Sequence, residues 1–181
     1  KILNATSLEF DFVSNLTTNQ ISFEYMFLSE EYQSSNCQYS DAFAFLIKKA
    51  DNSEPYQNIA LIPNTTIPVT SLTINGARDC PRNISYFGGF NSANSPTNFN
   101  GQTKVLKANA QIEAGTKYHI KLVIADHGDS KGRYDSAVFL KAGSFVGSKS
   151  LGSDVVLCPG TSETIDATTT NATTYKWYKD G

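Results

Sequence analysis

The stretch that decides the fold class is Ile21-Ser22-Phe23-Glu24-Tyr25-Met26-Phe27. Apolar side chains recur at every second position, and because successive side chains of a β-strand point to opposite faces, this alternation predicts a strand with one buried face. Leu8, Phe10 and Phe12 repeat the pattern within Leu8–Val13. Further strands are predicted over Asp41–Ile47, Asn58–Ile62, Thr103–Ile112, Lys117–Asp126 and Ser136–Ala142. With turns between them and no helical periodicity, they predict an all-β fold, a jelly-roll-like β-sandwich.

The composition agrees with an extracellular β protein. Of 181 residues, 40% are hydrophobic and 12% aromatic, which is enough for a buried core, whereas only 18% are charged. The formal net charge of −2 excludes an electrostatic case for binding nucleic acid, which requires a basic face. No apolar run approaches the ~20 residues of a membrane-spanning helix. The sequence from Lys1 onward shows no signal-peptide pattern, and we expect an exported protein to have lost its signal peptide.

The strand pattern is interrupted once by a segment with linker composition. We expect one domain over residues 1–145, a Gly- and Ser-rich linker over 146–153, and the beginning of a second domain over 154–181. The second segment combines short strand patterns with Cys158, Trp177 and a final Asp-Gly turn, which is typical of the start of an immunoglobulin-like sandwich. Its strands are predicted over Val155–Leu157, Thr164–Ala167 and Thr174–Tyr178, too few to fold alone.

Three cysteines are present. Cys37 and Cys80 lie in polar loops with no second Cys or His at metal-ligand spacing, so zinc is not expected. We predict a disulfide between them, with two free thiols as the alternative. Cys158 has no evident partner, and we expect one beyond Gly181.

Acidic residues concentrate where predicted strands end. Carboxylates on such loops can converge on one hard cation, and calcium takes about six to eight oxygen ligands. The candidate calcium ligands are Asp126, Asp129, Asp135, Glu30, Glu31 and Asp41. Because adjacent strand residues face opposite ways, we expect only one of the two glutamates to bind the ion. The alternative is that all six are solvated loop acids.

A long Asn- and Gly-rich loop over residues 87–101 is a second candidate site. Exposed aromatic rings and amides suit the recognition of a glycan, whereas the simpler interpretation is that the aromatic rings hold the loop against the core. The residues concerned are Phe90, Asn91, Asn94, Asn98 and Phe99.

Catalysis is the least supported interpretation. His119 falls within a predicted strand and is expected to be an ordinary sheet-face residue. His127, Asp126 and Ser136 could be arranged as a hydrolase triad, but no nucleophile-elbow sequence accompanies them. We therefore expect no enzyme.

The segments quoted above resemble the choice-of-anchor L domain family of bacterial surface proteins. The resemblance rests on the residues 8–13, 21–32, 40–45, 58–63, 118–126 and 135–145, in this order along the chain. The spacing between Asp129 and Asp135 is longer than the family pattern. The truncated second segment looks like one of the immunoglobulin-like, PKD-like repeats that accompany the family.

The resemblance implies a non-enzymatic surface or secreted adhesin of a large multidomain protein, exported by type IX secretion as in gliding bacteria. Calcium would stabilise the module. Expected partners are a surface protein, a glycan, or the secretion and outer-membrane machinery. A calcium-dependent carbohydrate-binding module is the alternative function, and a purely structural stalk unit remains open.

Overall fold

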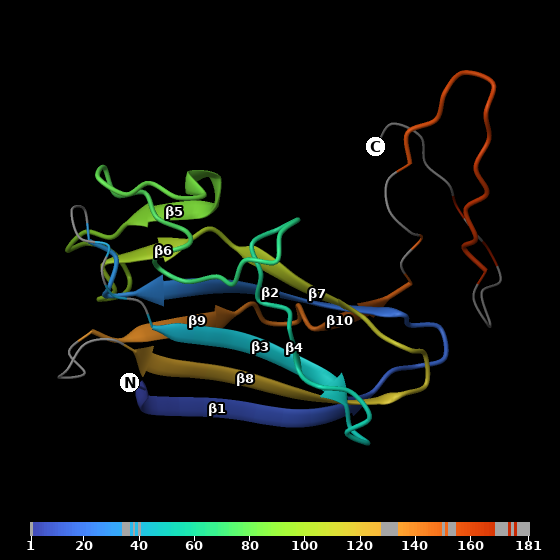
Figure 1. The fold of residues 1–181 in the computed structure, drawn as a ribbon, viewed down its shortest axis with the longest axis horizontal. Coiled ribbons are helices and arrows are strands. Elements are labelled where there is room, and N and C mark those ends of the chain that lie inside the picture. The colour runs from blue at the N-terminus through green and yellow to red at the C-terminus, as the bar shows by residue number, and fades with distance from the viewer. Residues whose placement is uncertain are drawn as a thin grey trace.

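The computed structural model describes residues 2–33, 37, 39, 41–127, 134–149, 151, 155–168, 174 and 176; of residues 2–4, 42, 126 and 127 it describes the backbone. The fold is an all-β sandwich of two sheets, which confirms the predicted class (Figure 1). A three-residue 3-10 turn, η1 (Ile84–Tyr86), is the one helical element in this part of the chain. None of its helices is long and apolar enough to span a membrane.

The first sheet contains four antiparallel strands in the order β1-β8-β3-β4. These are β1 (Ile2–Val13), β8 (Lys117–His127), β3 (Ala42–Lys49) and the short β4 (Gln57–Asn58). The inner positions of β8 and β3 agree with their apolar sequences, because central strands are buried over most of their length.

The second sheet is organised around β2 (Gln20–Ser29), the strand predicted most clearly. One edge of β2 pairs with β9 (Ser136–Leu140) and β10 (Val146–Ser148). The other edge pairs with β6 (Gly101–Thr103) and β7 (Leu106–Gln111). Outside β6 lies β5 (Phe87–Phe90).

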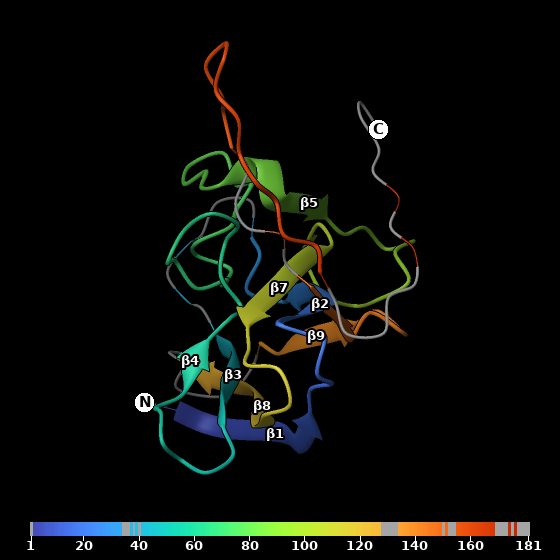
Figure 2. The ribbon, with the colours of Figure 1, turned by 90° about the vertical axis from the view of Figure 1, so that its right-hand side faces the viewer.

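The core fills the space between the two sheets, which face each other in the end-on view of Figure 2. Aromatic rings of β2 meet those of β3: the Tyr25 and Phe43 ring centroids are 5.6 Å apart, and those of Phe23 and Phe45 are 5.9 Å apart. Each ring removes a large apolar area from water, and tilted aromatic pairs add to the stabilisation. The predicted buried face of β2 is therefore confirmed.

The predicted strand Thr103–Ile112 is divided into β6 and β7. Along β2 the register moves by one residue between Leu28↔Gln102 and Tyr25↔Leu106, as at a β-bulge. At the bulge, the Phe27 backbone N–H donates to the Thr103 Oγ1 at 3.1 Å. A side-chain oxygen thus replaces the missing ladder partner.

Residues Val146–Ser148, the first three of the predicted linker, form β10, while the division of the chain into domains stays a prediction. After β9 the chain departs from the edge of β2, and it pairs with β2 again at β10. Between β9 and β10, Ser144 substitutes for backbone pairing: the Glu24 N–H donates to Ser144 Oγ at 3.0 Å, and Ser144 Oγ donates to the Glu24 carbonyl at 3.2 Å. Phe145 then stacks on Phe23 with a centroid separation of 4.5 Å. The ordered sheet therefore extends beyond the predicted boundary at residue 145.

Two further details differ from the sequence prediction. Leu8 was expected on the buried face, but it is 56% exposed, because it lies on edge strand β1 beside an open apolar groove shared with Val138 and Leu140 of β9.

The predicted strand Asn58–Ile62 ends at Asn58. There the Asn58 side-chain oxygen accepts from the Phe45 and Ala60 backbone N–H groups at 3.2 and 3.0 Å, so the strand ladder stops.

The segment after the sandwich forms no strand over residues 155–168, although strands were predicted at Val155–Leu157 and Thr164–Ala167. Val156 is 98% exposed. A strand needs a neighbour for its backbone N–H and C=O groups, and the described residues of this segment supply none. The third predicted strand lies mostly outside the described residues, and the immunoglobulin-like assignment stays a prediction.

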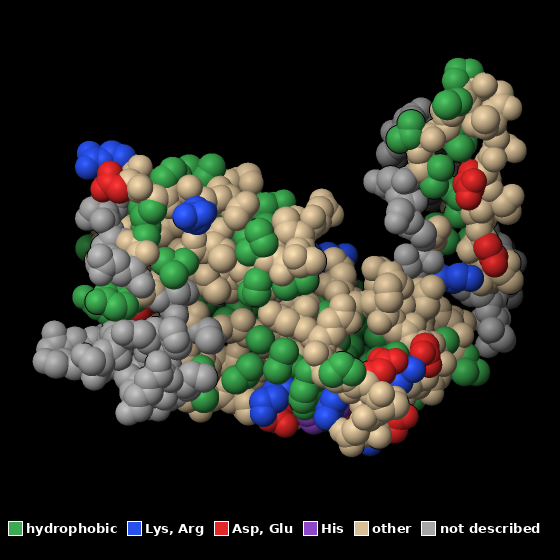
Figure 3. Space-filling view, in the orientation of Figure 1, with side chains coloured by type: hydrophobic (Ala, Val, Ile, Leu, Met, Phe, Trp, Pro, Cys, Tyr) green, Lys and Arg blue, Asp and Glu red, His purple; other side chains and the backbone are tan. Residues whose placement is uncertain are grey.

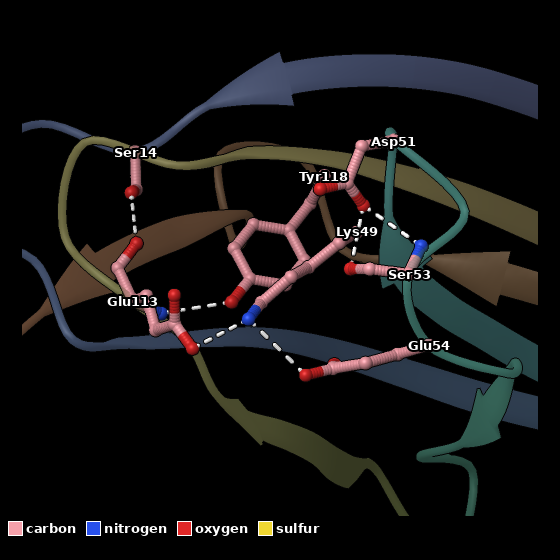
Figure 4. A network of polar contacts seen from close by, with 7 residues as sticks. All are labelled: Ser14, Lys49, Asp51, Ser53, Glu54, Glu113 and Tyr118. Carbon is pink, nitrogen blue, oxygen red and sulfur yellow. Dashed lines mark hydrogen bonds and ion pairs between the residues drawn. The ribbon is translucent and has the colours of Figure 1, made fainter.

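A polar network closes the end of the sandwich at which β2 begins (Figure 4). The Lys49 ammonium lies 2.6 Å from Glu113 and 3.1 Å from Glu54, and the Tyr118 hydroxyl accepts from the Glu113 N–H at 2.8 Å. Hydrogen bonds from Lys49 to the two glutamates raise the pKa of its ammonium group. Lys49 thereby links the β3–β4 hairpin to the turn before β8.

Candidate functional site

The predicted acidic residues that the structure describes lie at one end of the sandwich. Ser29 at the end of β2 pairs with Ser136 at the start of β9, and Ala42 at the start of β3 pairs with Ala125 near the end of β8. The residues Glu30, Asp41, Asp126 and Asp135 adjoin these pairs. We call this the acidic end; it lies on the left of Figure 1, opposite the Lys49 network.

Glu30 and Asp135 are joined across the β2 and β9 ends. The Glu30 N–H donates to the Asp135 carbonyl at 2.9 Å, and the Asp135 N–H donates to Glu30 Oε2 at 3.0 Å. Beneath them the Ser136 and Ser29 hydroxyl oxygens are 2.8 Å apart, and Ser29 Oγ accepts from the Glu31 N–H at 3.0 Å. This network fixes the backbone at the acidic end.

The two neighbouring glutamates, which follow the end of β2, differ in exposure. Glu31 is 5% exposed and Asp41 is 2% exposed, whereas Asp135 lies on the surface and Glu30 is partly exposed. The backbone of Asp126 lies in the same region, whereas Asp129 lies outside the described residues. Among the side chains that the structure describes, no three Asp, Glu, His or Cys residues come together as a metal site. The calcium-ligand set stays a prediction.

The loop between β5 and β6 curls into a polar hollow of about 330 Å³ lined by residues 91–93, 95 and 97–100. Asn91 joins the two ends of this loop. The Asn91 backbone N–H donates to the Asn100 carbonyl, and the Asn91 side-chain amide donates to the Phe99 carbonyl, both at 2.8 Å. Asn94 and Asn98 are exposed. The hollow therefore presents amide and hydroxyl groups to solvent.

The aromatic residues of this loop divide between the two predicted roles. Phe87, at the start of β5, packs against the core, and its ring centroid lies 5.3 Å from that of Tyr32. Phe90 contacts Phe87 at 4.9 Å but remains 42% exposed. Phe99 is partly buried. One ring thus anchors the hairpin, while Phe90 is accessible to a ligand.

The polar hollow and the acidic end are neighbours. Gly101 at the start of β6 pairs with Ser29, and the Asn100 side-chain amide donates to the Glu30 carbonyl. A ligand at either place would therefore lie beside the other. Sequence spacing gave no sign of this, because about 70 residues separate Glu30 from Asn100.

The predicted disulfide between Cys37 and Cys80 is confirmed. It joins the segment before β3 to the loop before η1, next to Asn75. The Asn75 side chain is buried, donates to the Ser71 carbonyl at 2.9 Å and accepts from the Ala77 N–H at 2.7 Å. Cys158 is a free and exposed cysteine.

The triad considered as an alternative receives no support from Ser136, whose hydroxyl is bonded to Ser29 rather than to a described histidine. The His127 and Asp126 side chains lie outside the described atoms. His119 is a sheet-face residue, as predicted, and its Nδ1 lies 2.7 Å from Asp11 Oδ1.

Comparison with known proteins gives one result. A family model described as the choice-of-anchor L domain matches residues 1–146. No curated protein and no solved structure matches the chain. The matched residues coincide with the sandwich up to the first residue of β10.

Proposed function

The chain belongs to the choice-of-anchor L domain family, and from that premise we propose that it is a non-enzymatic adhesion and display module, stabilised by calcium. Membership of this family makes it part of a surface or exported bacterial protein. The single observation that carries the proposal is the match over the whole sandwich. The Cys37–Cys80 disulfide supports it, because such bonds persist in oxidising, extracellular surroundings.

The finer parts of the proposal concern the route by which the protein is exported and the molecules that it binds. We place the protein among the cargo of type IX secretion in gliding or surface-attached bacteria, with a surface protein or a glycan as its partner. Antibody labelling of intact cells tests the location: signal on unbroken cells, lost in a strain without that secretion system, agrees with the proposal. Label that appears only after lysis contradicts it.

The calcium part of the proposal draws on the acidic end. Glu30 and Asp135 supply carboxylates from two adjoining strand ends, and Asp126 and Asp129 would complete the oxygen ligands that calcium prefers. Glu31 and Asp41 are buried just below this surface. A bound divalent cation would hold the ends of β2, β3, β8 and β9 together and offset the repulsion among these carboxylates.

Thermal unfolding of the full chain in EDTA and in millimolar calcium tests this part. An ion bound only by the native state at 100 times its dissociation constant stabilises by about 2.7 kcal/mol. For a domain of this size, that corresponds to a rise in melting temperature of about 5–11 °C. The Asp126→Ala/Asp129→Ala variant should lose the rise, whereas Glu163→Ala, at an exposed acid in the segment after the sandwich, should keep it. Equal melting temperatures with and without calcium in the unaltered protein would refute it.

A second candidate, a calcium-dependent carbohydrate-binding module, is favoured by the contact between Asn100 and Glu30, which sets the polar hollow beside the acidic end. Exposed Phe90 would stack on a sugar ring, and the amides of Asn94 and Asn98 would bind its hydroxyls. Screening immobilised glycans with and without calcium tests it. Binding that requires calcium and is lost in Phe90→Ala supports this function, and an absence of binding to all glycans favours a protein partner.

A further inference from the structure

A second polar site lies on the outer face of the β1-β8-β3 sheet, where three side chains form one row across neighbouring strands. Asp11 of β1 pairs in register with His119 of β8, and His119 pairs in register with Lys48 of β3. Neighbouring strands are about 4.8 Å apart, so the Cα atoms of Asp11 and Lys48 are about 10 Å apart, with His119 on the strand between them. Figure 3 shows charged side chains of both signs and a histidine gathered along this lower edge of the molecule.

The hairpin between β3 and β4 turns the row into a pocket. Tyr56 leans over the Lys48 end: the ammonium nitrogen lies 4.4 Å from the ring centroid, and the Tyr56 and His119 ring centroids are 6.1 Å apart. Asn52 approaches from the turn, and its side-chain oxygen accepts from Lys48 Nζ at 2.5 Å. Together with Ala50 these residues line a hollow of about 240 Å³.

The charges around the pocket are unevenly compensated. Asp11 is paired with Lys117 at 2.8 Å, and Glu9 beside it is paired with Lys121 at 2.7 Å. The His119 ring lies between the two acids, with Nδ1 2.7 Å from Asp11 and Nε2 3.4 Å from Glu9. Lys48, in contrast, has no carboxylate partner among the described residues; its ammonium contacts an amide oxygen and an aromatic face. The pocket therefore has a cation available for an anion at one end and hydrogen-bond acceptors at the other.

We propose that this pocket binds one acidic sugar unit of a polysaccharide, with the anionic group on Lys48 and the sugar hydroxyls on Asp11 and Asn52. Tyr56 would lie along the apolar edge of the sugar ring. The volume suits a ligand smaller than the ~300 Å³ lower limit of drug-sized sites. Carboxylate and sulfate are equally acceptable to Lys48, because an ammonium group acts as a point charge without the paired geometry of arginine.

The neighbouring acids limit the class of ligand. Asp11 and Glu9 disfavour a chain with a charge at every backbone unit, such as a nucleic acid, because like charges close together repel. A zwitterion such as a free amino acid is disfavoured as well, since the carboxylate of Asp11 is already paired with the ammonium of Lys117 and hydrogen-bonded to His119. One negative charge on a ring rich in hydroxyls fits this arrangement.

The site is separate from the acidic end. His119 and His127 are eight positions apart on β8, which corresponds to about 26 Å along a strand. Binding here requires no calcium, so the proposal stands or falls independently of the calcium site.

Isothermal titration of the full chain with three galactose-based trisaccharides tests it, each in EDTA: one with a single galacturonic acid unit, one with a single sulfated unit, and one that is neutral. We expect one or both acidic probes to bind, more weakly at high salt, and the neutral probe to bind at least tenfold more weakly, because a hydrogen bond to a charged group is worth about one decade of affinity or more. Which acidic probe binds distinguishes a carboxylated from a sulfated glycan.

Lys48→Met keeps an unbranched side chain against Tyr56 but removes the charge. It should weaken binding of the acidic probe about tenfold or more, with an unchanged melting temperature. Lys104→Met, at an exposed lysine near β6, is the matched control and should bind like the unaltered protein. Equal affinity for neutral and acidic probes, no binding of either acidic probe, or unaltered binding by Lys48→Met would overturn the proposal.

Discussion

The Cys37–Cys80 disulfide allows a quantitative prediction, because it closes a loop of 43 residues that carries the whole of β3 and its core side chains. Replacing both cysteines with serine restores conformational freedom to the unfolded chain. In the chain-entropy model, closing a loop of this length is worth about 4 kcal/mol at 25 °C. That is a substantial part of the ~5–15 kcal/mol by which ordinary domains are stable.

The loss should be measured by urea unfolding of the oxidised protein and of the Cys37→Ser/Cys80→Ser variant. With a slope of about 2 kcal/mol per molar urea, the midpoint should fall by about 2 M, and the melting temperature should fall by about 8–16 °C. The far-UV circular dichroism spectrum of the folded variant should not change, because the effect lies mainly in the unfolded state.

Cys158→Ser provides the control, since this exposed cysteine takes no part in the sandwich disulfide. It should leave both midpoints unchanged. A loss below about 1 kcal/mol in the double variant would refute the reasoning, because it would mean that the loop is already restricted without the bond.

Three further predictions concern packing and charge. Phe145→Ala should destabilise the protein by about 2–3 kcal/mol in urea unfolding, below the core value because this ring is 41% exposed, and a loss under 0.5 kcal/mol would show that its stacking on Phe23 is unimportant. Gly88→Ala should cost about 1–3 kcal/mol, since a Cβ would lie 2.6 Å from the Thr103 carbonyl oxygen; an unchanged melting temperature would contradict this. Hydrogen bonds from Lys117 and then His119 hold the pKa of Asp11 below its ordinary value of 3.8, so its contribution to stability is complete above about pH 4 and is lost as the pH falls through the lowered pKa. Asp11→Asn should therefore lose stability less steeply below pH 4, and parallel pH profiles would contradict the assignment.

The sequence predicted those features that depend on local periodicity. The alternation of Ile21–Phe27 was enough to identify β2 and its buried face, because a period of two needs no knowledge of a partner. The interruption at Thr103 could not be predicted in this way, since the bulge exists only because the Phe27 N–H finds that hydroxyl across the sheet. In the same manner, Val146–Ser148 has linker composition and becomes a strand because an edge of β2 is open to it.

The candidate site likewise combines features that the sequence predicts with features that depend on how the strands pair. The acids at strand ends were found from their positions, whereas the contact between Asn100 and Glu30 follows from the pairing of β6 with β2. The row of Asp11, His119 and Lys48 was missed because it depends on the register of three strands far apart in sequence. Single histidines and lysines in alternating strands give no signal of such a row.

The direction of the first and last strands of the sandwich determines how it bears mechanical load. β1 starts at the acidic end, where Ile2 pairs with His127, and β10 leaves at the opposite end, where Ser148 pairs with Gln20. Tension applied between these two points runs parallel to the strands, whereas the hydrogen bonds between antiparallel strands are perpendicular to them. The long β1–β8 ladder would therefore be loaded in shear, with its bonds sharing the force at once instead of opening one after another. A module held in this way would resist tension along the chain that contains it.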